Sequence, residues 1–285
     1  MPRSARRVAL EASFEQARAV AHEPGPGIFP VLGQHLLERR GQVVDLSRPI
    51  FEGMPLWFGH QKTFVVTNQD HDQFRAIWKT DAGFKARNLI LSEHAGTHVD
   101  AILEYDRDGP SIDQMPLAFF WGEAVCLDLS DVRFADPDPE GAGWATTDVI
   151  HRAEQRLADA GEAIRPGDIV LCWFDYGDRT YPDQRYTDQY PGLSYDAAEY
   201  LARKGVVNIG TDCIALDNSL DPQFSTHMLC KKYGIVNTES LANLGQLINR
   251  RFTFFGLPLY LPGGTGSPIR AFAFLPQSVS PRLPR

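Results

Sequence analysis

The chain has 285 residues, of which 43% are hydrophobic and 22% charged, and its formal net charge is -8. This composition is that of a globular protein with enough apolar residues for a substantial core, and it excludes disordered and fibrous classes. The acidic excess, with no dense basic run beyond Arg3, Arg6 and Arg7, argues against a nucleic-acid or anionic-membrane surface, so we expect neither partner.

The cysteines and the N-terminal segment indicate the compartment. The chain has 4 widely spaced cysteines and no C-x-x-C pair, which favours neither a disulfide framework nor a zinc ribbon. The basic N-terminus lacks an apolar core, and no later run approaches the roughly 18 apolar residues that span a bilayer. We therefore expect a cytoplasmic protein.

The sequence divides at about residue 41. Residues 1–40 are predicted to be a helical leader of mixed charge that is interrupted at Pro24 and Pro26 and could pack on a partner subunit. Residues 41–285 are expected to form a single domain. Short apolar runs bounded by Gly, Pro and Asn predict its first strands at 43–46, 64–67, 88–92 and 124–130.

Helix and strand then alternate, which indicates an α/β architecture. Apolar residues at helical spacing follow Thr147 until Gly161, and Ser194 can cap a second helix that Gly205 ends. Buried strands follow these helices at 168–174 and 206–211, and two further strands are predicted within 251–262 and 269–276. The polar and aromatic segment 175–192 is too long for a simple connection and is expected to wall a site or an interface.

A possible metal site follows the apolar run at 88–92. His94, His98 and Asp100 stand in the pattern H-x-x-x-H-x-D, and two imidazoles with a carboxylate suit zinc, manganese or ferrous iron. One helical turn from His94 to His98 would place both rings on one face. Gly96 and two β-branched residues favour instead a loop that runs into a strand or helix. The alternative interpretation is that these are partly buried polar residues with ordinary hydrogen bonds.

A second group stands later in the chain, where His227 precedes Glu239 by twelve residues. Taken alone, His227 suits the start of a helix and Glu239 the first turn of another helix, where an acid complements the helix dipole. Of the other histidines, His60 in the stretch WFGH stays unassigned.

The blocks around these residues resemble the cyclase family of metal-dependent hydrolases, which includes bacterial kynurenine formamidase, isatin hydrolase and a zinc-dependent trans-dienelactone hydrolase. The resemblance begins with DLSRPIFEGMPLW, which ends at Trp57, and continues through SEHAGTHVDA at 92–101. Further blocks follow in order at 109–130, 190–212, 226–247 and 261–273. It implies a compact α/β domain in which a mixed, β-barrel-like sheet is flanked by helices.

The resemblance also implies a ligand set. His94, His98 and Asp100 would bind one divalent ion, zinc or manganese, and His227 and Glu239 would hold a second ion that Asp100 bridges. Some relatives hold one ion only, so one or two ions per subunit are expected.

One residue departs from the family pattern. The family motif usually continues as D-A-P-x-H, whereas this chain reads DAILE, so Glu104 stands where the family commonly has a catalytic histidine. A carboxylate can also accept and return a proton, and we expect Glu104 to be the general base. The alternatives are that Glu104 is a further ligand or a structural acid. The exchange favours a lactone or another amide over N-formylkynurenine.

The predicted reaction is attack of a metal-bound hydroxide on an amide or ester carbonyl of a small cyclic or aromatic substrate. Aromatic residues that could line a pocket for a flat ring are Trp57, Phe58, Phe119, Phe120 and Trp121, although such stretches are more often core. One alternative is a metal-dependent cyclase or lyase step on a polyketide-like substrate, and another is a non-catalytic metal-binding relative.

The resemblance implies a homodimer or homotetramer as well. In the family the N-terminal loop often reaches a neighbouring subunit, which here would be the stretch 53–60. Part of each pocket would then come from the partner chain.

Overall fold

The computed structural model describes residues 41–132 and 143–276; the predicted leader at 1–40 lies outside the described residues. The chain splits into two compact units, one formed by Val44–Ala273 and one to which the described residues 41–43 and 274–276 belong. The boundary falls inside the strands β1 (Gly41–Asp45) and β13 (Phe272–Pro276). None of the described helices is long and apolar enough to cross a membrane.

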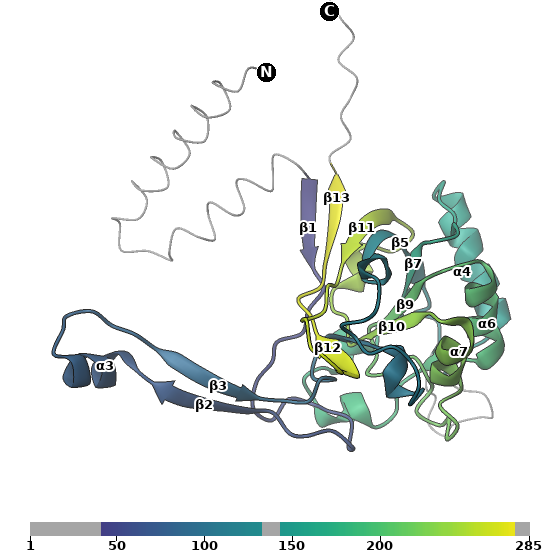
Figure 1. Ribbon diagram of the computed structural model, residues 1–285. Coiled ribbons are helices and arrows are strands. Elements are labelled where there is room, and N and C mark those ends of the chain that lie inside the picture. Colours follow the sequence, from purple (N-terminus) through teal and green to yellow (C-terminus); the bar gives the residue numbers. More distant parts are fainter. Residues whose placement is uncertain (1–40, 133–142, 277–285) are drawn as a thin grey trace, which may run out of the picture. The chain divides into compact units, whose positions relative to one another are not determined.

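A nine-stranded, curled sheet carries the fold (Figure 1). Its strand order is β1-β13-β11-β5-β7-β9-β10-β4-β12. The strands between the edges are β11 (Arg251–Phe255), β5 (Trp121–Asp128), β7 (Ile169–Trp173), β9 (Asn208–Thr211), β10 (Val236–Glu239) and β4 (His98–Asp100), and β12 (Gly266–Pro268) ends the order. The central strands β5, β7, β9 and β10 run parallel, whereas β11, β4 and β12 pair antiparallel with their neighbours. The sheet is therefore mixed, as the family resemblance implies.

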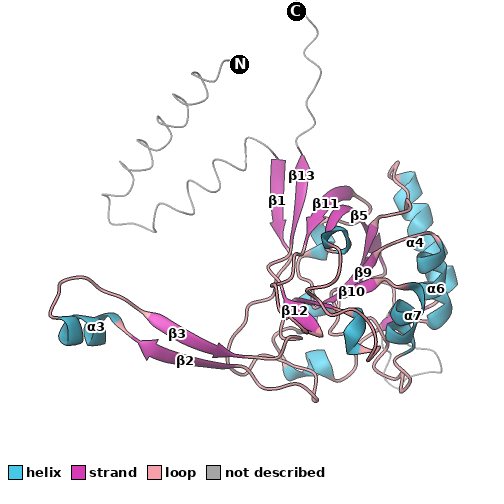
Figure 2. Ribbon diagram, in the orientation of Figure 1, coloured by secondary structure: helices cyan, strands magenta, loops and turns pink. Residues whose placement is uncertain are grey.

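Three helices connect the parallel strands and lie along one side of the sheet (Figure 2). They are α4 (Thr147–Asp159), α6 (Tyr195–Arg203) and α7 (Ser225–Tyr233). The first buries Val149, Ile150, Ala153 and Leu157 against the sheet, and its neighbour buries Ala197, Ala198, Leu201 and Ala202. Ser194 caps α6 by accepting a hydrogen bond from the backbone of Ala197 at 3.3 Å. Burial of these apolar stripes is the main driving force for the layered packing.

Short elements complete the domain. The predicted loop at 175–192 contains α5 (Gly177–Thr180) and the 3-10 turn η3 (Gln184–Thr187), and β6 (Trp144–Ala145) pairs with β8 (Gly192–Leu193) beside it. The remaining 3-10 turns are η1 (Ile102–Glu104), η2 (Leu117–Phe119) and η4 (Leu244–Gln246).

A separate hairpin consists of β2 (Phe64–Gln69) and β3 (Ala86–Ile90), joined through α3 (His71–Trp78). Helix α3 buries none of its residues. Large apolar side chains on this hairpin are 44% to 67% exposed: Phe64, Val66, Ile77, Trp78, Phe84, Leu89 and Ile90. A two-stranded hairpin is marginally stable by itself in water. This arm therefore carries apolar surface that nothing in the described chain covers.

Candidate metal centre and its cavity

The first ligand group is built by a turn that leads into β4. His94 lies in the turn, and His98 and Asp100 are the ends of the strand, so their side chains share one face. Gly96 has a φ of 68°, which favours glycine, and its carbonyl accepts a hydrogen bond from Nδ1 of His98 at 2.8 Å. The predicted loop is present, and of the two alternatives that could follow it, a strand or a helix, the chain forms the strand β4. The His98 ring thereby presents Nε2 toward Asp100.

The atoms of this group converge on one carboxylate oxygen. Oδ1 of Asp100 lies 2.7 Å from Nδ1 of His94 and 3.3 Å from Nε2 of His98. The other nitrogen of His94 donates to Oγ1 of Thr265 at 3.0 Å, because that hydroxyl donates in turn to Glu93 at 2.8 Å. Because the other nitrogen of each ring carries the hydrogen, Nδ1 of His94 and Nε2 of His98 present lone pairs toward Asp100. The Asp100 side chain is completely buried. Two imidazole nitrogens and a carboxylate oxygen in this arrangement fit a zinc-class ion.

The second group meets the first at Asp100. His227 lies in the first turn of α7 and donates from Nδ1 to the carboxylate of Asp217. Its Nε2 faces Oδ2 of Asp100 at 3.7 Å and Oε1 of Glu239 at 3.5 Å. Glu239 ends the strand β10 and pairs with His98 across the ladder, so the interpretation as a first-turn helix acid is wrong.

An amide group lies among the atoms of this second group. Nδ2 of the buried Asn237 lies 2.6 Å from Oδ2 of Asp100, 2.7 Å from Oε1 of Glu239 and 3.4 Å from Nε2 of His227. These are the three atoms that would ligate a second ion. Asn237 and Glu239 are two residues apart on one strand, so the period of two could have indicated their shared face.

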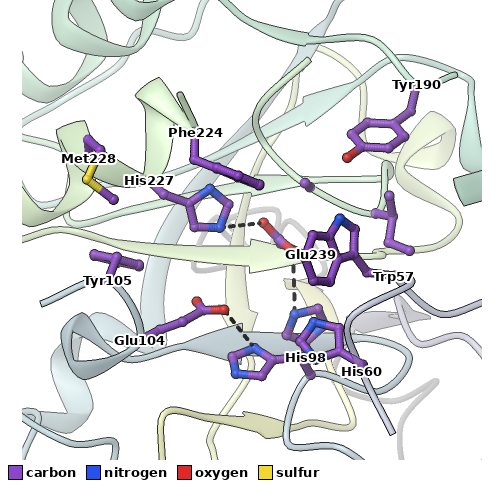
Figure 3. A pocket seen from close by; sticks show the side chains of 13 residues that line it. Trp57, His60, His98, Glu104, Tyr105, Tyr190, Phe224, His227, Met228 and Glu239 are labelled. Carbon is purple, nitrogen blue, oxygen red and sulfur yellow. Dashed lines mark ion pairs between the residues drawn. The ribbon is translucent and has the colours of Figure 1, made fainter. Parts of the chain in front are cut away.

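Glu104 lies beside the first group, at the end of η1 (Figure 3). Its Oε1 is 3.5 Å from Nδ1 of His94. Burial, together with the charges of Asp100 and Glu239, raises the pKa of Glu104 to about 9. A carboxyl group with a raised pKa close to a ligand group can take up and release a proton in the neutral range once a cation is bound beside it.

Both groups face a cavity of about 260 Å³. Figure 3 shows its residues, which come from separate parts of the chain. They are Trp57, His60, His94, His98, Glu104, Tyr105, Tyr190, Ile214, Ala215, Phe224, His227, Met228 and Glu239. Tyr190 belongs to the segment 175–192 that was expected to wall a site.

The aromatic residues singled out in the sequence lie in different places. Trp57 lines the cavity, whereas Phe58 is 90% exposed and lines a neighbouring hollow. Trp121 stacks on Phe255 at a centroid distance of 6.1 Å, and neither it nor Phe119 lines these two hollows. Sequence reasoning did not find Tyr105, Phe224, Asp217 or Thr265, which no local pattern connects to the histidines.

His60 occupies the wall of the cavity next to the first group. Its ring stacks on His94 with a centroid distance of 5.1 Å and an interplanar angle of 23°. Burial and the charges of His94 and His98 lower the pKa of His60 to about 4. The sequence offered no sign of this placement, since the two histidines are separated by more than thirty positions.

Comparisons with known proteins agree with this arrangement. The family model described as "Putative cyclase" matches residues 44–218. An isatin hydrolase of Roseibium aggregatum is 32% identical over 87% of this chain and 97% of its own length. A kynurenine formamidase of Salinibacter ruber is 28% identical over 80% of this chain and 95% of its own length.

Solved structures of isatin hydrolases are also similar to this chain. An isatin hydrolase bound to the product analogue thioisatinate superposes with a TM-score of 0.71 and 26% identity, covering 87% of this chain and 98% of that chain. Isatin hydrolase A from Ralstonia solanacearum gives a TM-score of 0.70 and 25% identity, covering 90% of this chain and all of its own. The similarity therefore extends over almost the whole length of these enzymes.

Proposed function

Since the chain belongs to the cyclase family of hydrolases, we propose that it hydrolyses the amide bond of a small cyclic or aromatic substrate with the help of a divalent metal ion. The observation that carries this proposal is the convergence of His94, His98 and Asp100 on one side of a cavity that Glu104 also faces. A divalent ion held by these three ligands would polarise the substrate carbonyl and lower the pKa of a bound water molecule.

The chain's own groups supply the proton transfers. Glu104 accepts a proton from the attacking water and returns it to the leaving nitrogen, which is the role of a general base and then a general acid. Trp57, Tyr105 and Phe224 provide apolar walls that exclude bulk water and pack against a flat ring. Lactones have the same reacting carbonyl, so a dienelactone is included among the substrates to be tested.

We propose further that each chain holds one ion. The amide of Asn237 donates two hydrogen bonds to the oxygens that a second ion would need, and an amide nitrogen does not ligate metals. Asn237, together with His227 and Glu239, would then hold Asp100 in place through hydrogen bonds. The choice between zinc and manganese depends on supply as well as on these ligands.

Metal analysis of the purified protein tests this count. We expect about one equivalent of zinc or manganese in the wild type, and a second equivalent after titration of Asn237→Ala with the same ion. Asn88→Ala, an exposed asparagine on the hairpin, serves as the control. Two tightly bound ions in the wild type, or one ion in Asn237→Ala, would contradict the proposal.

Hydrolysis assays test the reaction itself. Isatin, N-formylkynurenine and a dienelactone should be compared before and after chelation, with activity restored by zinc or manganese. Incorporation of oxygen-18 from water into the product distinguishes hydrolysis from a cyclase or lyase reaction. Tightly bound metal without turnover of any substrate would favour a non-catalytic relative.

The assembly is proposed to be a homodimer or homotetramer. Its support is the exposed apolar surface of the hairpin Phe64–Ile90, which packing against another copy would cover. The stretch 53–60 contributes Trp57 and His60 to the cavity wall, so an interface near it would affect the pocket.

A cytoplasmic location is proposed from the thiols. All four cysteines, Cys126, Cys172, Cys213 and Cys230, are free and buried. Unpaired cysteines are typical of proteins in a reducing compartment.

A further inference from the structure

His60 is held in the cavity wall by a tight turn and by its neighbour. Its backbone N–H donates to the carbonyl of Trp57 at 3.0 Å, and its ring is stacked on the ring of His94 at an interplanar angle of 23°. The ring thus lies against a ligand of the first group and faces the cavity that would hold the substrate.

A serine determines which ring nitrogen carries hydrogen. Oγ of Ser92 accepts a hydrogen bond from the backbone of His94 at 3.1 Å and lies 3.2 Å from Nδ1 of His60. Across the described residues, Nδ1 is the one acceptor within reach of the Ser92 hydroxyl hydrogen. The hydroxyl therefore donates to Nδ1, and the neutral ring carries its hydrogen on Nε2.

Nε2 of His60 differs from the other ring nitrogens of the cavity. His94, His98 and His227 each have both nitrogens engaged by carboxylates, carbonyls, hydroxyls or the Asn237 amide. Within residues 41–132 and 143–276, Nε2 of His60 has no hydrogen-bond partner. It carries a hydrogen whether the ring is neutral or charged, so a donor is present in either state.

We propose that His60 is a catalytic residue whose Nε2–H donates a hydrogen bond to the substrate carbonyl oxygen, and that Ser92 is the positioning residue that fixes this tautomer. The inference rests on the proposed hydrolysis. As water attacks the carbonyl carbon, the π electrons move to the oxygen that His60 faces, and the water proton passes to Glu104. The C–N bond then breaks, the electron pair returns to the carbonyl, and the leaving nitrogen takes the proton. A hydrogen-bond donor that is already in place stabilises the negative charge that develops on this oxygen and so lowers the barrier to attack.

The kinetic test removes the donor and keeps the stacked ring. We expect His60→Phe to lower kcat by about 10²–10³-fold with metal content unchanged, and His60→Gln, which retains an N–H donor, to recover part of that loss. His151→Phe, on the surface of α4, is the matched control. Tyr190→Phe removes one tyrosine hydroxyl from the cavity wall, and a loss of kcat confined to that variant would overturn the inference.

The tautomer can be measured without activity. In protein labelled with ¹⁵N-histidine and loaded with zinc, NMR should show His60 protonated at Nε2, with a mixture of tautomers in Ser92→Ala and recovery in Ser92→Thr. A ring protonated at Nδ1, or full kcat in His60→Phe, would overturn the inference alone. A wild type that hydrolyses none of the substrates would overturn the proposed function and this inference with it.

Discussion

Oε1 of Glu104 lies 3.5 Å from Nδ1 of His94, the same nitrogen that faces Asp100 across 2.7 Å. The carboxyl group of Glu104 therefore lies next to His94 but farther from it than the carboxylate of Asp100. Under the proposed mechanism, proton transfer at this edge therefore depends on a carboxyl group next to an imidazole.

Glu104→Gln should keep the metal and lose turnover. An amide cannot accept the proton of the attacking water, so we expect kcat to fall about 10²–10⁴-fold. Metal content, measured on the same preparation, should match the wild type. If the metal is lost together with activity, Glu104 is a ligand and its role as the general base is wrong.

Thr265→Val should weaken metal binding. The hydroxyl of Thr265 links Nε2 of His94 to Glu93 and so orients the ring. Loss of such a support typically lowers metal affinity about 10–100-fold. Competition with a chelator of known affinity measures the change, and Thr253→Val, on β11 near the other end of the sheet order, is the control. Equal affinities in the two variants would show that Thr265 does not support His94.

Leu89→Asp should reduce the size of the assembly. The side chain is 55% exposed on the hairpin, and a charge there would have to be buried against a second copy. Light scattering coupled to size-exclusion chromatography measures the mass, and Asn88→Asp adds the same charge beside it as a control. A wild type that is already monomeric, or a fully active monomer of Leu89→Asp, would contradict the proposed assembly.

The fold should gain stability from Asp212 as the pH falls. Three backbone N–H groups, from Phe174, Tyr176 and Gly177, donate to this buried carboxyl, yet burial raises its pKa from 3.8 to about 6. The native state therefore binds a proton that the unfolded chain releases. The contribution is complete below about pH 4 and is lost as the pH rises through about 6.

Urea unfolding between pH 4 and 8 measures this contribution. The free energy of unfolding of the wild type, relative to Asp212→Asn, should be about 2 kcal/mol larger at pH 4 than at pH 8. The variant itself is expected to be less stable throughout, because an amide cannot accept all three hydrogen bonds. A difference that does not change with pH would show that Asp212 titrates normally.

Local patterns predicted much of the fold because the signals are short-range. The stripes of α4 and α6, with Ser194 as a cap, follow from apolar spacing and capping chemistry. The shared face of His98 and Asp100 follows from the strand period. The order of the nine strands could not be derived in this way, since pairings such as β4 with β12 join residues far apart in the chain.

The supporting groups of the site were also beyond local reasoning. Asp217 and Thr265 act on His227 and His94 through contacts between distant segments, and a single carboxylate or hydroxyl in the sequence carries no sign of its partner. Trp121 could be read as a pocket residue because the sequence does not show that its ring stacks on Phe255 of the adjacent strand.

The pairing of Glu239 with His98 across β10 and β4 has a consequence for protein engineering. Strand register fixes the spacing of these two groups, and a shift of either strand by one residue would turn its side chain to the other face. Trp57 and Phe224, by contrast, lie outside the nine strands of the sheet. Libraries that vary these loop positions can therefore change which compounds the enzyme accepts while the sheet preserves the reacting centre.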